Sequence, residues 1–111
     1  MLNHYQQGCV DVVQLDDRLT VEEVDAVRAS LDSVFQGRLP QVVLDMRRVR
    51  LVDSAGLELI CDSHEKCLQR GGAIRLAAAS PMLRSIFRIT GIEKELALHP
   101  DVVSAAGAFA L

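Results

Sequence analysis

The sequence lacks the marks of a secreted or membrane-spanning protein. Its 111 residues include three cysteines, an odd number that does not suit a disulfide framework. Residues 1–5 carry neither the basic start nor the apolar run of a secretory signal peptide. The longest nearly apolar stretch, residues 102–111, is about half as long as a membrane-spanning helix. These absences predict a cytoplasmic protein in a reducing compartment, with no membrane insertion.

An excess of charge of one sign is also absent. Twelve Lys and Arg stand against fifteen Asp and Glu, for a formal net charge of −3, which argues against a general affinity for nucleic acid or for an anionic membrane. Residues 1–35 nevertheless hold seven acids and two bases, so we expect an acidic face. Gly and Pro are scarce and half the residues are hydrophobic, as in ordinary globular domains. The length then predicts a single domain over residues 1–111.

Short apolar runs predict the strands. After the first residues, strands are expected over residues 9–15, 42–44, 73–78 and 96–98. A turn at Gln7 and Gly8 folds the first of these back on the chain start, which predicts an N-terminal hairpin. The continuous apolar run of 42–44 is typical of a central strand buried on both faces, and it ends at Asp45.

Helical spacing and capping residues predict four helices. They are expected to begin near Thr20 (with Glu23 as a capping box), Asp53, Ser80-Pro81 and Asp101, and the first three to end at Gly37, Gly71-Gly72 and Gly91. The second helix is expected to bury Leu57, Ile60, Cys61, His64 and Leu68, and the last to follow a stripe of Val103, Ala106 and Phe109. The core is expected to include Leu44, Ile60, Ile86 and Phe87.

The element order ββαβαβαβα predicts an α/β fold. Strands that alternate with helices at this spacing need right-handed crossovers, and they build a mixed, mostly parallel sheet of about four to five strands with about four helices. In such sheets, binding sites gather where strands lead into helices. This directs attention to residues 45–57, of which 46–52 are expected to form a polar loop.

The run Asp53-Ser54-Ala55-Gly56-Leu57 places a hydroxyl at a helix start. Free N–H groups and the positive end of the helix dipole face outward there. The simplest interpretation is a helix cap, since Asp and Ser are both favoured in that position. Glycine early in a helix costs up to about 1 kcal/mol relative to alanine, so Gly56 indicates that another backbone or a partner approaches closely.

These features together resemble the STAS domain family over nearly the whole chain. The shared features are the strand ending at Asp45, the 53–57 motif, the Gly71-Gly72 break and Ser80-Pro81 before the third helix. The chain is similar in particular to free-standing anti-sigma-factor antagonists, whose Asp-Ser-small-Gly-Leu motif opens the second helix and carries a phosphorylatable serine. That serine corresponds to Ser54.

The resemblance implies a partner switch. The unphosphorylated antagonist would bind a serine kinase of the histidine-kinase-like ATPase fold, which acts as the anti-sigma factor, and would release the sigma factor or other target that the kinase holds. Phosphorylation of Ser54 would end that binding, and a metal-dependent serine phosphatase would reverse it. The chain would then be a substrate and not an enzyme, and would need no cofactor. The expected partner-binding residues are Asp53, Ser54, Ala55, Gly56, Leu57, Arg47, Arg48 and Arg50.

The arginines allow two interpretations. Arg47, Arg48 and Arg50 either form a solvated loop, as exposed arginines often do, or meet an acidic partner or the phosphoserine, because arginine pairs well with phosphate oxygens. The loop after the second expected strand departs from the family pattern. Many members have Gly-x-Leu-Asp there, whereas residues 17–20 of this chain read Asp-Arg-Leu-Thr. That departure weakens any expectation about kinase contacts at residues 17–20.

Other functions remain as alternatives. The same helix end would serve in a cytosolic STAS subunit of an ABC-type phospholipid transport system, docking on the ATPase subunit without phosphorylation. A small-ligand or nucleotide sensor is a third class. Cys61, His64 and Cys67 are spread too far along one helix to share a metal ion, so no metal site is expected. No Gly-x-Ser-x-Gly elbow or Gly-rich phosphate loop is present.

Overall fold

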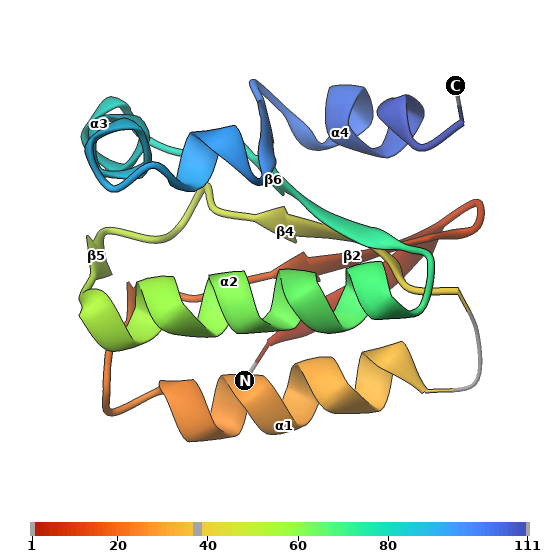
Figure 1. The fold of residues 1–111 in the computed structure, drawn as a ribbon, viewed down its shortest axis with the longest axis horizontal. Coiled ribbons are helices and arrows are strands. Elements are labelled where there is room, and N and C mark those ends of the chain that lie inside the picture. The colour runs from red at the N-terminus through yellow and green to blue at the C-terminus, as the bar shows by residue number, and fades with distance from the viewer. Residues whose placement is uncertain (1, 37–38, 111) are drawn as a thin grey trace.

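A computed structural model describes residues 2–36 and 39–110, and its main sheet has five strands in the order β1-β2-β4-β6-β7 (Figure 1). The strands are β1 (Asn3–Gln7), β2 (Val10–Gln14), β4 (Gln41–Asp45), β6 (Ala73–Ala77) and β7 (Ala97–His99). β1 pairs antiparallel with β2, and every other neighbouring pair is parallel. The predicted hairpin and the mixed, mostly parallel sheet are therefore confirmed.

The helices lie on both faces of the sheet. They are α1 (Val24–Phe35), α2 (Ser54–Gln69), α3 (Pro81–Ile89) and α4 (Val102–Ala108), with a 3-10 turn η1 (Ile92–Lys94) before β7. α1 and α2 cover one face and α4 the other (Figure 1). The main sheet and these helices have the predicted order ββαβαβαβα. Gly37, the expected end of the first helix, lies outside the described residues.

The core has two parts because the sheet is covered on both faces. The larger part joins the sheet to α1, α2 and α3 and contains Leu44, Ile60 and Phe87, as predicted, whereas Ile86 is only half-buried. The smaller part lies under α4, where Ala105 and Ala106 contact the sheet. The described helices lack the combination of length and apolar character needed to cross a bilayer.

The segment expected to be a polar loop contains a strand and two core residues. Leu51–Val52 form a short strand, β5, which pairs in parallel with β3 (Arg18–Leu19). Met46 and Val49 are buried. Two-residue strands carry no measurable hydrophobic period, so this small second sheet could not be predicted from alternation.

The α2 stripe was predicted with the wrong rotation. The helix buries Gly56, Leu59, Ile60, Ser63, His64 and Cys67. Leu68 is 54% exposed, and Leu57 and Cys61 are only half-buried. Both stripes obey helical spacing, so periodicity cannot choose between them. In α4 likewise, Val103 is 70% exposed while Ala105 and Ala106 are buried.

Half of the predicted capping box forms before α1. The Glu23 carboxylate accepts the Thr20 backbone N–H at 3.0 Å and the Thr20 hydroxyl at 2.6 Å. The helix itself begins at Val24, after Glu23, whose side chain makes no cap hydrogen bond. These hydrogen bonds lower the pKa of Glu23.

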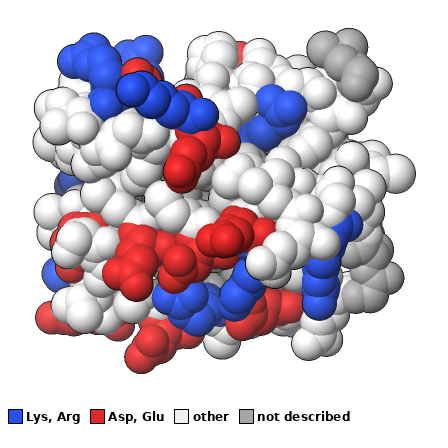
Figure 2. Space-filling view, in the orientation of Figure 1, with Lys and Arg blue, Asp and Glu red and all other residues white. Residues whose placement is uncertain are grey.

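Acidic side chains gather over α1, which lies within residues 1–35 as expected, and also over α2, which does not (Figure 2). Figure 2 shows Asp and Glu side chains gathered there, with Lys and Arg side chains among them. Part of this charge is balanced locally, because Arg28 pairs with Asp62 at 3.8 Å and Lys66 with Asp32 at 3.3 Å.

Candidate functional site

Asp53 caps α2 and leaves the neighbouring Ser54 free. Asp53 Oδ1 accepts the Gly56 N–H at 2.9 Å, which satisfies one of the open donors of the helix start. Ser54 is the first helical residue and is exposed. Its hydroxyl makes no hydrogen bond to any residue within 2–36 or 39–110. The capping interpretation therefore holds for Asp53, whereas Ser54 presents an unengaged hydroxyl to solvent.

Asp53 also ties two parts of the chain together. Its Oδ2 accepts the Val21 N–H at 2.9 Å, and its own N–H donates to the Leu19 carbonyl at 3.3 Å. The hydrogen bonds from Gly56 and Val21 hold the pKa of Asp53 below its usual value. An ionised carboxylate therefore stands next to Ser54 at neutral pH and fixes the helix start against the segment before α1.

Gly56 is required by the close approach of the chain itself. A Cβ at this position would lie 2.1 Å from the Leu19 carbonyl oxygen. No side chain fits without a shift of the Leu19 backbone. The room that the sequence indicated at Gly56 is thus filled by β3, and the approaching backbone is not that of a partner.

The three arginines differ in their surroundings. Arg47 is exposed and pairs with Asp45, Nη2 to Oδ2 at 3.4 Å, and its backbone N–H donates to Oδ1 of the same carboxylate at 3.0 Å. Arg50 is exposed and pairs with Asp17. Arg48 is exposed and has no ion pair with another described residue. Arg48 is accordingly the arginine of this loop whose charge is not offset by a carboxylate within residues 2–36 and 39–110.

Two exposed apolar side chains near Ser54 were missed by the sequence reasoning. Val21 is 67% exposed, although its N–H is held by Asp53. Leu51 is 49% exposed and lies in β5, opposite Arg18. The sequence patterns predict a helix at Val21 and a polar loop at Leu51, whereas Val21 follows β3, Leu51 lies in β5 and both side chains are exposed.

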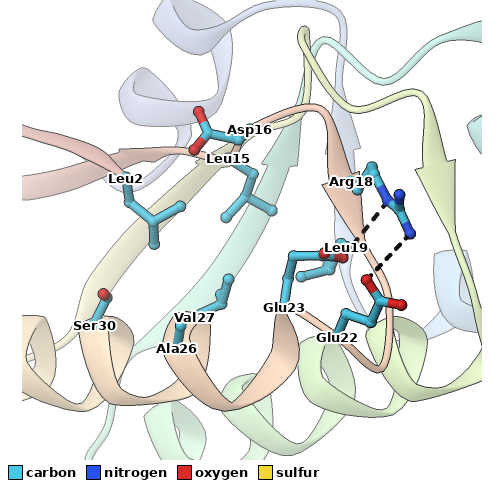
Figure 3. A pocket seen from close by; sticks show the side chains of 10 residues that line it. All are labelled: Leu2, Leu15, Asp16, Arg18, Leu19, Glu22, Glu23, Ala26, Val27 and Ser30. Carbon is cyan, nitrogen blue, oxygen red and sulfur yellow. Dashed lines mark ion pairs between the residues drawn. The ribbon is translucent and has the colours of Figure 1, made fainter.

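A cavity of about 220 Å³ lies beside this segment, between β3 and α1 (Figure 3). Its floor is apolar and includes Leu15 and Leu19. Arg18 also lines the cavity and forms ion pairs with Glu22 at 3.8 Å and with Glu23 at 4.0 Å (Figure 3). Ser54 and the arginines of residues 47–50 do not line it, so the cavity is separate from the helix start.

Cys61, His64 and Cys67 are held by burial and hydrogen bonding within the fold. His64 Nδ1 accepts the Ile74 N–H at 3.1 Å, and burial lowers the pKa of this histidine. Burial also raises the pKa of Cys61, and it raises that of Cys67 to about 12. Both thiols stay protonated at neutral pH. Within the described part of the chain, no three His, Cys, Asp or Glu side chains gather as a metal site.

Comparison with known proteins finds a family model and a relative that each match most of the chain. The model of the STAS domain family matches residues 2–105. The anti-sigma F factor antagonist of Paenibacillus polymyxa is 25% identical over 95 residues, which are 85% of this chain and 81% of that protein.

Two solved structures have the same fold. An anti-sigma-factor antagonist (STAS) domain protein from Planctomyces limnophilus superposes with a TM-score of 0.89 at 19% identity, over 99% of this chain and 98% of that one. The Bacillus cell fate determinant SpoIIAA in its phosphorylated form superposes with a TM-score of 0.75 at 20% identity, over 98% and 99% of the two chains.

Proposed function

The chain belongs to the STAS domain family, and on this basis we propose that it is an anti-sigma-factor antagonist of a bacterial partner-switching pathway. In this proposal it binds a serine kinase of the histidine-kinase-like ATPase fold, which is also the anti-sigma factor, and so frees the sigma factor or other target. Phosphorylation of Ser54 ends the binding, and a serine phosphatase restores it. The protein acts in the cytoplasm, in signal transduction that regulates transcription, and it is a substrate and not an enzyme.

The observation that carries this proposal is the exposed, unengaged hydroxyl of Ser54 at the first position of a fixed helix start. Asp53 performs the capping, so a kinase can reach the Ser54 Oγ without undoing a hydrogen bond of the described chain. The name of the Paenibacillus polymyxa relative supports the antagonist role, and that of the phosphorylated SpoIIAA structure supports regulation by phosphate.

The transfer itself is a balanced exchange at one oxygen. Ser54 Oγ forms a bond to the γ-phosphorus of the ATP that the kinase holds, the bond from that phosphorus to the β,γ-bridging oxygen breaks, and ADP leaves. The hydroxyl proton passes to a base of the kinase. The phosphate brings roughly −1.5 to −2 charges at neutral pH to a helix N-terminus, which accommodates an anion without unfolding.

The same charge opposes the complex. In a packed interface the phosphate is desolvated beside the ionised Asp53, a like charge one residue away. The exposed side chains of Val21 and Leu51 and the cation of Arg48 are proposed to complete the partner surface with residues 53–57, Arg47 and Arg50. Apolar contacts supply affinity, and rim charges mainly speed encounter.

Phosphate transfer tests the proposal directly. The purified protein is incubated with its cognate kinase and ATP, and the modified residue is identified by mass spectrometry. We expect one phosphate, on Ser54, and none in Ser54→Ala. Ser104→Ala is the matched control, because Ser104 is also an exposed serine in the first turn of a helix capped by an aspartate, Asp101. Phosphate on Ser104, or on Ser54→Ala as readily as on the wild type, contradicts the assignment.

A further inference from the structure

The two edges of the main sheet are protected unequally. β7 has three residues, and Pro100, which has no backbone N–H, follows it. β1 has five exposed residues, and none of them is Asp, Glu, Lys, Arg or Pro. Edge strands in natural proteins are usually shielded by charge, by proline or by shortness. The β1 edge carries none of these three protections.

The hairpin determines which backbone groups of β1 face outward. Gly8 and Cys9 form a two-residue turn, with Gly8 at φ +62°, and Gln7 faces Val10 as the closing pair. In an antiparallel ladder, the residues of such a closing pair exchange hydrogen bonds, and every second residue along the strand repeats the pattern. The backbone groups of Asn3, Tyr5 and Gln7 therefore face β2, and those of the residues between them face away from it.

We propose that β1 pairs antiparallel with β1 of a second copy of this chain, about a twofold axis at Tyr5. The pairing joins the two five-stranded sheets into one continuous sheet. In this register Tyr5 faces Tyr5 of the second copy, and Asn3 faces Gln7 of the second copy. Identical antiparallel strands satisfy the symmetry of such a contact automatically.

The composition of β1 favours a second copy as the occupant. Each copy has a formal net charge of −3, so self-association is best tolerated where Asp, Glu, Lys and Arg are absent, as they are along Asn3–Gln7, where His4 contacts Asp11 of its own chain. Amide side chains can pair with one another across the axis. Tyr5 is 47% exposed, and facing aromatic residues on neighbouring strands stabilise a sheet.

The neighbouring face of α1 permits the same approach. The side of α1 beside β1 has small, uncharged and exposed residues: Ala26, Ala29, Ser30 and Ser33. Leu2, His4, Ala29 and Ser33 help to line a hollow between the strand and the helix. Pairing of the two β1 strands brings this face of α1 toward its symmetry mate, and small side chains allow the two helices to approach.

The contact involves neither Ser54 nor residues 17–23, so it is independent of the proposed function. A pairing of two five-residue strands is smaller than the standard protein interface of about 1,600 Å². We therefore expect a weak dimer, half-dissociated at roughly 10 µM to 1 mM.

Sedimentation equilibrium from about 10 µM to 1 mM, the range of weak interfaces, tests the proposal. We expect a monomer–dimer equilibrium for the wild type, and at least about tenfold weaker association for Tyr5→Lys, which places like charges at the axis. Ala97→Lys is the matched control, since Ala97 is exposed on the opposite edge strand, and it should dimerise as the wild type does. Circular dichroism confirms that each variant is folded.

A disulfide cross-link tests the register of the two β1 strands without the charge that Tyr5→Lys introduces. In a Cys9→Ser background, Tyr5→Cys places one thiol on each side of the axis, where facing Cα atoms of a non-hydrogen-bonded pair are about 4.5 Å apart and can be bridged. We expect a covalent dimer under mild oxidation, and much slower cross-linking of Asn3→Cys. A wild type that is monomeric at every concentration overturns the proposal. So does a dimer that survives Tyr5→Lys, or equal cross-linking of the two cysteine variants.

Discussion

The starts of two helices, α2 and α3, use serine in opposite ways. Before α3, Ser80 is itself the cap: its Oγ accepts the Leu83 N–H at 3.2 Å, and Pro81 occupies the first helical position. Before α2, Asp53 is the cap and Ser54 occupies the first helical position with an unengaged, exposed hydroxyl. A shift of one residue relative to the cap thus separates a structural serine from an available one.

The two helix starts also differ in how they contact the rest of the chain. Asp53 joins α2 to residues 19–21 through backbone hydrogen bonds, and Gly56 admits the Leu19 carbonyl against the helix. The hydrogen bond of Ser80 stays within the first turn of α3. The α2 start is therefore held by a neighbouring segment, which keeps Ser54 in place while its hydroxyl remains open.

The largest expected effect is at Gly56. Gly56→Ala puts a methyl group where the Leu19 carbonyl oxygen lies, so β3 has to move. We expect a loss of about 1 to 3 kcal/mol in the free energy of unfolding, measured in urea, because overpacking has this typical cost. Gly107→Ala is the matched control: Gly107 is also helical but has open space around it. Equal stability of the two alanine variants would mean that β3 does not press on α2.

Removal of the helix caps at Ser80 and Asp53 should have a smaller effect on stability than Gly56→Ala. Ser80→Ala removes one capping hydrogen bond, and such a loss typically costs about 0.5 to 2 kcal/mol of stability. Asp53→Ala removes acceptors of two backbone N–H groups and frees the segment at Val21, so we expect it to lower the midpoint of urea unfolding further. Ser54→Ala, the control, should change the free energy of unfolding by less than about 0.5 kcal/mol. A large loss in Ser54→Ala would contradict an unengaged hydroxyl.

The sequence predicted the elements that local signals mark. The hairpin, the buried β4 strand, and the starts of α2, α3 and α4 at Asp53, Ser80 and Asp101 are where the turn residues, apolar runs and caps indicated. Each of these signals acts over a few neighbouring residues, so it can be read without knowledge of the tertiary structure. The position of Ser54 at a helix start follows from the same local chemistry.

The remaining features depend on contacts between distant segments. β3 pairs with β5, and the Leu19 carbonyl of β3 lies against Gly56 of α2. α2 packs against α1, burying Leu59 and leaving Leu68 exposed. Residues thirty or more positions apart determine these outcomes, and no local pattern records them.

Affinity for the cognate kinase tests the central claim most directly. The dissociation constants of the wild type, Ser54→Ala and Ser54→Asp are measured with purified proteins, after circular dichroism has confirmed that all three are folded. Ser54→Ala should bind as the wild type does, because the hydroxyl has no partner in the described chain. Ser54→Asp should bind roughly tenfold to a hundredfold more weakly, since a second carboxylate is desolvated beside Asp53. Equal affinity of all three proteins, with no phosphate transfer to the wild type, would contradict the switch and favour docking on a transporter ATPase subunit.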